Sequence, residues 1–585
     1  MESSNNTNQS TNRVPLGGDY WKAEPAAPLW GMADLHAHLM AHLAFGGNAF
    51  WGKPYDPDSA GEEGIARALA SCEPIHGGLI DINVEFGHPA GVGYPDFDIW
   101  PRFTTLIHQQ AYIDWLYRAY QGGLRLISAL AVNNELLATR SDPLTGTDDR
   151  SAITIQVSGM KAMVEHIDKL AGGPGKGWMQ IAYSPSEASA IIASNKLAIV
   201  LGMEVDSLGN WRRADDLQML SQGSTEQARA LIAEELDWLY GLGIRQITPV
   251  HLTNNAFGGT AIYMRILEVG NRFVTGQGYE TEDAWETGVR YRLDNDSDVI
   301  EDVERTAMST KPIVKTRNMN HGTLVDHLPG VHKHGSESHA PTGHGASANV
   351  RSLSPYGHIL LEEMMKRGMV IDIDHMSQKT LDSALDLAEA HEYPVISSHA
   401  WFRDLAFSAE VVFEHDNLIP YGTGDVHTVA HELGKRADQI ERISRLGGVI
   451  APILNQGDMA GLARTDPELA QKVPHPCAGS STAWAQAYLY IAKKMGGRGV
   501  AFGSDLNGAA AMPGPRFGTL AAFGACNDHF RVKQRRHEID SQVNGVRYDT
   551  PIRDYRWFRF LESGPGGYDQ EEREIWQAVA SYKAG

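Results

Sequence analysis

The chain has 585 residues, of which 42% are hydrophobic and 21% charged, a balance typical of a globular protein with a sizeable core. Its 51 basic and 72 acidic residues give a net charge of −21, which repels nucleic acid and anionic lipid and argues against both as partners. The three cysteines, Cys72, Cys477 and Cys526, are too few and too scattered for a disulfide framework or a cysteine-rich zinc module.

Residues 1–30 are polar and are predicted to be a partly disordered N-terminal segment. They lack the basic and apolar regions of a secretory signal. No stretch approaches the roughly 18 consecutive apolar residues that a membrane span needs. We therefore expect a cytoplasmic protein without a membrane span, acting on a small-molecule substrate. A homo-oligomer is compatible with this sequence.

Eight short apolar runs alternate with helical patterns between residues 31 and 510. They cover residues 32–39, 124–132, 197–205, 244–252, 368–376, 393–400, 447–454 and 499–508. Strand–helix alternation is typical of parallel βα units, and eight units predict an α/β protein built on a closed (β/α)8 TIM barrel. An open doubly wound sheet is the alternative, but no glycine-rich phosphate-binding sequence follows the first run.

Two insertions, residues 40–122 and 253–350, are longer than a plain barrel requires. Both follow the carboxyl end of a predicted strand, the face on which barrel enzymes build their active sites. The tract 321–346 is rich in histidine, but its histidines lack regular ligand spacing, so we predict a surface loop. The polar segment 276–346 is expected to add little to the core. Residues 511–585 are predicted to form a C-terminal helical extension packed on the barrel.

Polar residues end six of the eight runs, and in a barrel such residues converge on one pocket. They are His36, His38, Glu204, His251, Asp374, His375, His399 and Asp505. Burying so many imidazoles and carboxylates without partners would cost several kcal/mol for each group, so we expect a bound cation. Imidazole and carboxylate ligands without thiolates suit zinc best, and manganese, iron or cobalt less well. These ligands exceed what one four-coordinate zinc can use, which favours two divalent ions bridged by a carboxylate.

Six motifs occur in a characteristic order along the chain. They are "DLHAHL" (34–39), "LGMEVD" (201–206), "PVHLTNN" (249–255), "GMVIDIDHMS" (368–377), "YPVISSH" (393–399) and "FGSDLNG" (502–508). As an ordered set they resemble the metal-dependent amidohydrolase superfamily and, within it, the membrane (renal) dipeptidase family. The resemblance implies a metallohydrolase that cleaves a dipeptide-like C–N bond with hydroxide activated by a binuclear metal centre.

The resemblance also implies the metal ligands. One ion would be held by His36, His38, Glu204 and Asp505. Glu204 would bridge to a second ion held by His375 and His399.

Further roles follow from the same resemblance. His251 would polarise the scissile carbonyl, and Asp505 would accept the proton of the bridging water. Ligand imidazoles are usually oriented by neighbouring groups, and apart from the resemblance Asp34 and Asp374 are candidates for this role.

The sequence departs from the family pattern at several places. His38 stands where the family usually has aspartate, and "DLNG" replaces a two-acid sequence. The arginine that binds a dipeptide carboxylate has no match in context, and Arg403 and Arg436 are the candidates. Two alternative functions stay open. The same site could act on a lactone, cyclic amide or cyclic diketone, or the chain could be a metal-stabilised binding protein without turnover.

Overall fold

A computed structural model describes part of the chain. The described residues are 29–72, 93–95, 107–289, 291, 293, 346–406, 430–456, 466–473, 481–496, 498–510 and 512–513. The predicted disordered N-terminus, the histidine-rich tract and the C-terminal extension lie almost entirely outside them. Among the described helices, none is long and apolar enough to cross a membrane.

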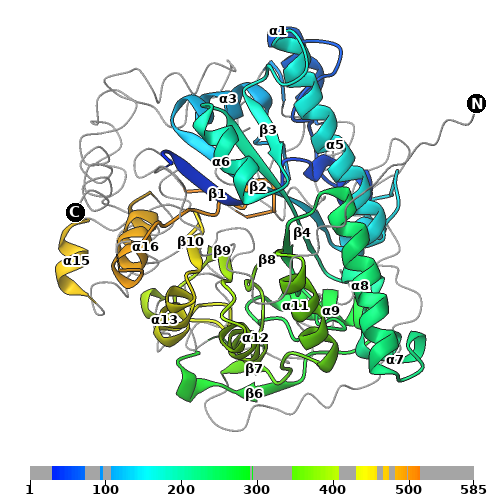
Figure 1. The fold of residues 1–585 in the computed structure, drawn as a ribbon, viewed down its shortest axis with the longest axis vertical. Coiled ribbons are helices and arrows are strands. Elements are labelled where there is room, and N and C mark those ends of the chain that lie inside the picture. Colours follow the sequence, from blue (N-terminus) through cyan, green and yellow to red (C-terminus); the bar gives the residue numbers. More distant parts are fainter. Residues whose placement is uncertain are drawn as a thin grey trace, which may run out of the picture.

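A parallel sheet forms the centre of the molecule, and helices surround it (Figure 1). Its strands follow one another in the order β1 (Met32–Ala37), β2 (Leu124–Asn133), β4 (Leu197–Val205), β5 (Gln246–Thr248) and β8 (Val370–Ile371). β2 and β4 are almost continuously apolar and largely buried, as expected of parallel strands covered on both faces. The predicted α/β fold with parallel strands is therefore confirmed.

One strand of this sheet was not predicted. β3 (Met179–Ala182) pairs with the first half of β4, and β5 pairs with its second half. The four residues of β3, "MQIA", are too short a run to stand out from the helical sequences around them.

Three further segments continue the parallel pairing. β9 (Ile396–Ala400) and β10 (Val449–Pro452) pair with each other. The eighth predicted run forms no continuous strand, but it makes single parallel bridges with its neighbours. The bridges that join these segments are Asp372–Ile396, Ile453–Gly503, Asp34–Phe502 and Ala37–Leu506.

The surrounding helices begin where the sequence offers capping residues. The side chains of Asp148, Ser184, Ser224, Ser354 and Ser377 each accept a hydrogen bond from a main-chain N–H of the helix that follows. These helices are α5 (Asp149–Leu170), α6 (Pro185–Ala193), α8 (Thr225–Leu242), α11 (Pro355–Lys366) and α12 (Gln378–Ala390).

The other described helices complete this layer or lie in the connections. They are α1 (Gly61–Ala68), α3 (Ile113–Gln121), α4 (Glu135–Arg140), α7 (Ala214–Leu220), α9 (Arg265–Thr275), α13 (Ala437–Arg445), α15 (Pro467–Gln471) and α16 (Ser481–Lys494). Short 3-10 helices cover Ala41–Leu43, Phe45–Gly47, Leu208–Asn210, Trp285–Thr287 and Arg403–Leu405.

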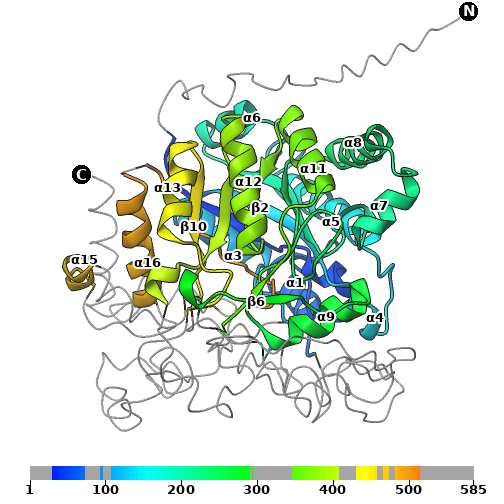
Figure 2. The same cartoon turned by 90° about the horizontal axis from the view of Figure 1, so that it is seen from below.

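The described part of the second insertion lies at one end of the molecule, the lower end in Figure 2. It contains α9 and an antiparallel pair, β6 (Thr281–Asp283) with β7 (Ser347–Asn349). The expectation that residues 276–346 add little to the core is wrong for the part that is described. Tyr279 and Leu293 are buried in a cluster with Trp401, because the β6–β7 pair folds this polar segment against residues distant in sequence.

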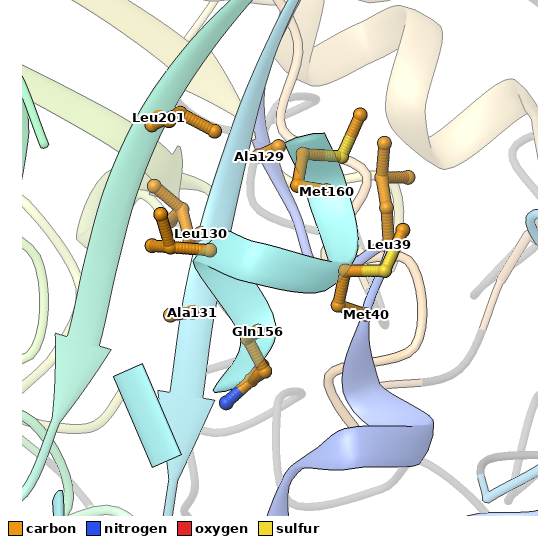
Figure 3. Close-up of a pocket in the computed structure, with 9 residues that line it drawn as sticks. Leu39, Met40, Ala129, Leu130, Ala131, Gln156, Met160 and Leu201 are labelled. Atoms are coloured by element: carbon orange, nitrogen blue, oxygen red, sulfur yellow. The ribbon is translucent and has the colours of Figure 1, made fainter. Parts of the chain in front are cut away.

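A small cavity lies between β2 and α5 (Figure 3). Its volume is about 10 Å³, which leaves room for at most one water molecule. Gln156 is the polar side chain in its otherwise apolar wall, and its amide donates to the carbonyl oxygens of Val132 and Ala152. The cavity is therefore a packing gap rather than a substrate pocket.

Gly503 lies where the eighth run meets β9 and β10. A Cβ atom at this position would lie 2.1 Å from the carbonyl oxygen of Ser398 and 2.8 Å from the Cα of His399. We expect Gly503→Ala to lower the free energy of unfolding by about 1–3 kcal/mol, because backbone atoms would have to move aside. Urea unfolding measures this change.

Gly241→Ala is the matched control for this prediction. Gly241 lies in α8, and nothing lies within 4 Å of a Cβ atom built there. This variant should be neutral or stabilising, since alanine is the better helix former. Equal unfolding midpoints for the wild type and Gly503→Ala would contradict the close approach at Gly503.

Candidate metal centre

Strand β1 brings two histidines to one site. His36 lies in β1 and His38 directly follows the last residue of that strand, and because alternate residues of such a segment share a face, the two side chains project together. The main chain around them pairs with the eighth run: the Asp505 N–H donates to the His36 carbonyl, and the His38 N–H donates to the Leu506 carbonyl. This pairing places the Asp505 carboxylate beside the two imidazoles.

The first group of side chains is compact, and its members are buried except for the partly exposed Asp505. The Nε2 atoms of His36 and His38 lie 3.1 Å apart. Oε2 of Glu204 lies 3.0 Å from the first and 3.4 Å from the second. Oδ1 of Asp505 lies 3.7 Å from Nε2 of His36 and 3.2 Å from Nε2 of His38.

A second group faces the other oxygen of the same glutamate. His375 follows β8 and His399 lies on β9, and their Nε2 atoms are 2.8 Å apart. Oε1 of Glu204 lies 3.2 Å from Nε2 of His375 and 4.0 Å from Nε2 of His399. Glu204, near the carboxyl end of β4, thus has one pair of histidines on each of its two oxygens.

The opposite nitrogens of these rings are held by other partners. Nδ1 of His38 is 3.1 Å from the Leu130 carbonyl oxygen, which can only accept, so this nitrogen is the donor. Ser398 Oγ lies 2.7 Å from Nδ1 of His36 and 3.1 Å from Nδ1 of His399. In the neutral form of His38, Nε2 therefore carries the lone pair, and this nitrogen faces Glu204 and Asp505.

These residues fit a divalent cation. Lone pairs of facing imidazoles and carboxylates repel one another unless a positive charge lies between them. Oε1 of Glu204 is buried and accepts no hydrogen bond from any residue that the structure describes. Two sets of side chains, His36–His38–Glu204 and Glu204–His375–His399, each bring their ligand atoms within 4.8 Å of one another.

Electrostatics at the site favour a cation. Burial opposes charge on Glu204, but the neighbouring histidines hold its pKa well below the usual value. Burial also opposes charge on His36, yet Glu204 and Asp505 raise its pKa to about 10. In His375 burial outweighs the attraction of Glu204 and lowers the pKa to about 4. The centre holds anionic carboxylates in a buried setting, which a divalent ion would compensate.

His251 lies beside the two groups. Its Nε2 is 3.6 Å from Oε2 of Glu204, and its Nδ1 is 3.2 Å from Oδ1 of Asp206. Its ring stands edge-on to that of His375, with centroids 4.8 Å apart. The structure therefore brings all seven predicted metal and catalytic residues into one cluster.

The two acids expected to orient imidazoles differ in their contacts. Asp374 accepts from the His399 main-chain N–H at 2.7 Å, and its Oδ2 lies 3.3 Å from Nδ1 of the His399 ring. Asp34 accepts from the main-chain N–H groups of His36 and Ser504. Asp374 thus contacts a ligand ring, whereas these hydrogen bonds of Asp34 go to the main chain that carries the ligands.

The two arginines considered for substrate binding make contacts within the protein. Arg403 is buried and donates to the carbonyl oxygens of Thr287, His431 and Glu432. Arg436 lies at the start of α13 and pairs with Asp382 of α12 and Asp438 of α13. None of these contacts is made with a residue of the metal-ligand cluster.

Sequence reasoning missed several neighbours of the cluster. Asp206 stands two residues after Glu204 in the same motif, and Ser398 directly precedes His399, so both could have been noticed from their spacing. Lys435, whose Nζ is 2.7 Å from Oδ1 of Asp374, has no signal in the sequence around it.

A family model supports the resemblance found in the motifs. The model of the membrane dipeptidase family (peptidase family M19) matches residues 332–418, a span that contains His375 and His399. This match, over part of the chain, confirms the resemblance to the membrane dipeptidase family that the motifs indicate.

Two relatives align with short parts of the chain. An uncharacterized dipeptidase of Schizosaccharomyces pombe is 33% identical over 100 residues, which are 17% of this chain and 18% of the relative. The dipeptidase tcpJ of Claviceps purpurea is 36% identical over 78 residues, which are 13% of this chain and 16% of the relative. The chain therefore aligns with less than a fifth of either relative.

Solved structures match over a larger part of the chain but with low scores. A metallopeptidase of Rhodobacter sphaeroides bound to a phosphinate mimic of L-Ala-D-Ala is 12% identical and covers 68% of this chain and 78% of its own, with a TM-score of 0.34. The probable dipeptidase PvdM of Pseudomonas aeruginosa is 14% identical and covers 80% and 88%, with a TM-score of 0.33. TM-scores of this size do not establish a shared fold.

Proposed function

We propose that this protein is a metal-dependent hydrolase that cleaves a dipeptide-like C–N amide bond at a centre of two divalent ions, with Zn²⁺ as the ion that the ligands suit best. One observation carries the proposal: each oxygen of the buried Glu204 carboxylate faces a pair of histidine Nε2 atoms. A carboxylate between two sets of nitrogen ligands suits a binuclear site. The match to the membrane dipeptidase family supports amide hydrolysis as the reaction.

The architecture that holds this centre is inferred to be a closed (β/α)8 barrel. The five-stranded run β1-β2-β4-β5-β8 continues through single bridges to β9, and β10 continues to the eighth run. Phe502 of that run pairs with Asp34 of β1, which returns the pairing to the first strand. The proposed ligands then stand at the carboxyl ends of the strands, where barrel enzymes carry their active sites.

His36, His38, Glu204 and Asp505 would hold one ion, and Glu204, His375 and His399 the other. Ions bound there would acidify a water molecule and polarise a carbonyl oxygen. The chain itself would supply the proton transfers. Asp505 is the most accessible carboxylate of the centre, with its side chain 13% exposed against 3% for Glu204, and would accept a proton and return it to the leaving amine.

In its protonated form, with Nδ1–H directed at Asp206, His251 would donate a hydrogen bond from Nε2 to the reacting carbonyl oxygen. We expect His251→Ala to keep both ions, because it belongs to neither group of ligand atoms. Its kcat should fall about 10²-fold, the usual effect of losing one donor to a developing oxyanion. Steady-state kinetics combined with metal analysis checks both parts. A variant with the wild-type kcat would contradict the assigned donor role.

The substrate class is tested by supplying the metal-loaded full chain with dipeptides, lactams and lactones in parallel. Hydrolysis of dipeptides above the other classes is expected. Preferential turnover of lactams or lactones would assign the same centre to a non-peptide carbonyl substrate. Metal binding without turnover of any class would contradict the enzymatic proposal.

A further inference from the structure

Lys435 is a fully buried cation close to the metal-ligand cluster. Its side chain is 1% exposed, and its Nζ lies 2.7 Å from Oδ1 of Asp374, which is equally buried. Removing an ammonium group from water is unfavourable unless a well-placed anion compensates the charge. A lysine retained in this position therefore calls for a reason beyond packing.

The main chain fixes Lys435 against the strand that carries His399. The Lys435 N–H donates to the Trp401 carbonyl at 2.8 Å, and its own carbonyl accepts from the Arg403 N–H at 3.0 Å. This pairing, a parallel bridge between Phe402 and Lys435, begins only a few residues after His399. The lysine is thus held at a constant position relative to the end of β9.

The carboxylate that Lys435 contacts is surrounded by donors. Oδ1 of Asp374 accepts from Ser397 Oγ at 2.6 Å as well as from Lys435. Oδ2 accepts from the His399 main-chain N–H at 2.7 Å and lies 3.3 Å from Nδ1 of the ring. One oxygen is therefore anchored by the lysine and a hydroxyl, while the other faces the proposed ligand.

We propose that Lys435 is a positioning residue of the metal centre: it anchors Asp374 so that Asp374 holds the His399 ring with Nε2 toward His375 and Glu204. This inference rests on the proposed metal centre. Groups that orient a ligand imidazole typically change metal affinity 10- to 100-fold when they are removed. The effect should fall on the ion held by His375 and His399, because no contact of Lys435 or Asp374 described above reaches His36 or His38.

The test is a Zn²⁺ titration of the full chain after chelator treatment, with a competing chromophoric chelator to measure both affinities. For Lys435→Met we expect one of two ions to bind about 10- to 100-fold more weakly and the other to bind as in the wild type. Lys379→Met is the matched control, because Lys379 forms an exposed pair with Glu282 at 2.7 Å. The control should bind both ions normally.

The outcomes separate this inference from the proposed function. A wild-type chain that binds no Zn²⁺ would overturn the metal centre itself. Two normal affinities, or two equally weakened ones, in folded Lys435→Met would overturn the positioning role. If circular dichroism shows this variant to be unfolded, Lys435→Met combined with Asp374→Asn removes both buried charges. Selective weakening of one ion in the double variant would support the proposal, and normal or uniformly weakened binding would overturn it.

Discussion

His36→Ala and His399→Ala are each expected to lose at least one of two divalent ions and nearly all turnover. The reason is geometric, because the Nε2 atoms of the two imidazoles face different oxygens of Glu204. The distance is 3.0 Å from His36 Nε2 to Oε2 and 4.0 Å from His399 Nε2 to Oε1. Removing one nitrogen leaves an incomplete set of ligands around that ion and an uncompensated buried carboxylate. Elemental analysis of the dialysed protein, together with dipeptide hydrolysis, measures both losses.

His391→Ala is the control for this pair. His391 lies at the end of α12 and belongs to neither ligand group, so metal content and turnover should match the wild type. A preparation of either ligand variant that retains two ions and full activity would contradict the assignment. Full activity of a metal-free wild-type preparation would contradict the proposed function as a whole.

Asp505→Asn is expected to separate metal binding from proton transfer. An asparagine keeps one carbonyl oxygen 3.2 Å from the position of the His38 Nε2 atom, so the variant should retain much of its metal. The amide cannot accept the proton that the carboxylate would take. We therefore expect kcat to fall at least about 10²-fold and up to about 10⁴-fold, the range for loss of a general acid–base group.

Glu204→Gln is expected to differ from Asp505→Asn in its metal content. Glu204 faces both pairs of histidines, so this variant should lose metal as well as activity. The Asp505 prediction is checked by measuring metal content and kcat on the same preparations. An Asp505→Asn variant with the wild-type kcat would remove the proton-transfer role, and one with no bound metal would show that Asp505 acts chiefly as a ligand.

The strand–helix alternation and the candidate ligands could be predicted from the local sequence pattern. Each of these residues ends an apolar run of a kind that parallel strands need, and the ends of parallel strands meet on one face. His36 and His38 share a face because a strand has a period of two, a property that does not depend on the rest of the molecule.

Other features were decided by tertiary structure alone. The contacts between Glu204 and the histidine pairs depend on how β4 lies against strands that are distant in sequence, since His36 and Glu204 are 168 residues apart. Lys435 contacts Asp374, and Tyr279 packs with Trp401, through pairings that no local pattern specifies. Arg403 and Arg436 are chemically suited to bind a substrate carboxylate. In the structure, however, Arg403 donates to the Thr287 carbonyl and Arg436 pairs with Asp382. Local sequence sets which side chains can act, whereas long-range pairing decides which of them meet, since burial and ion pairs form between segments far apart in the chain.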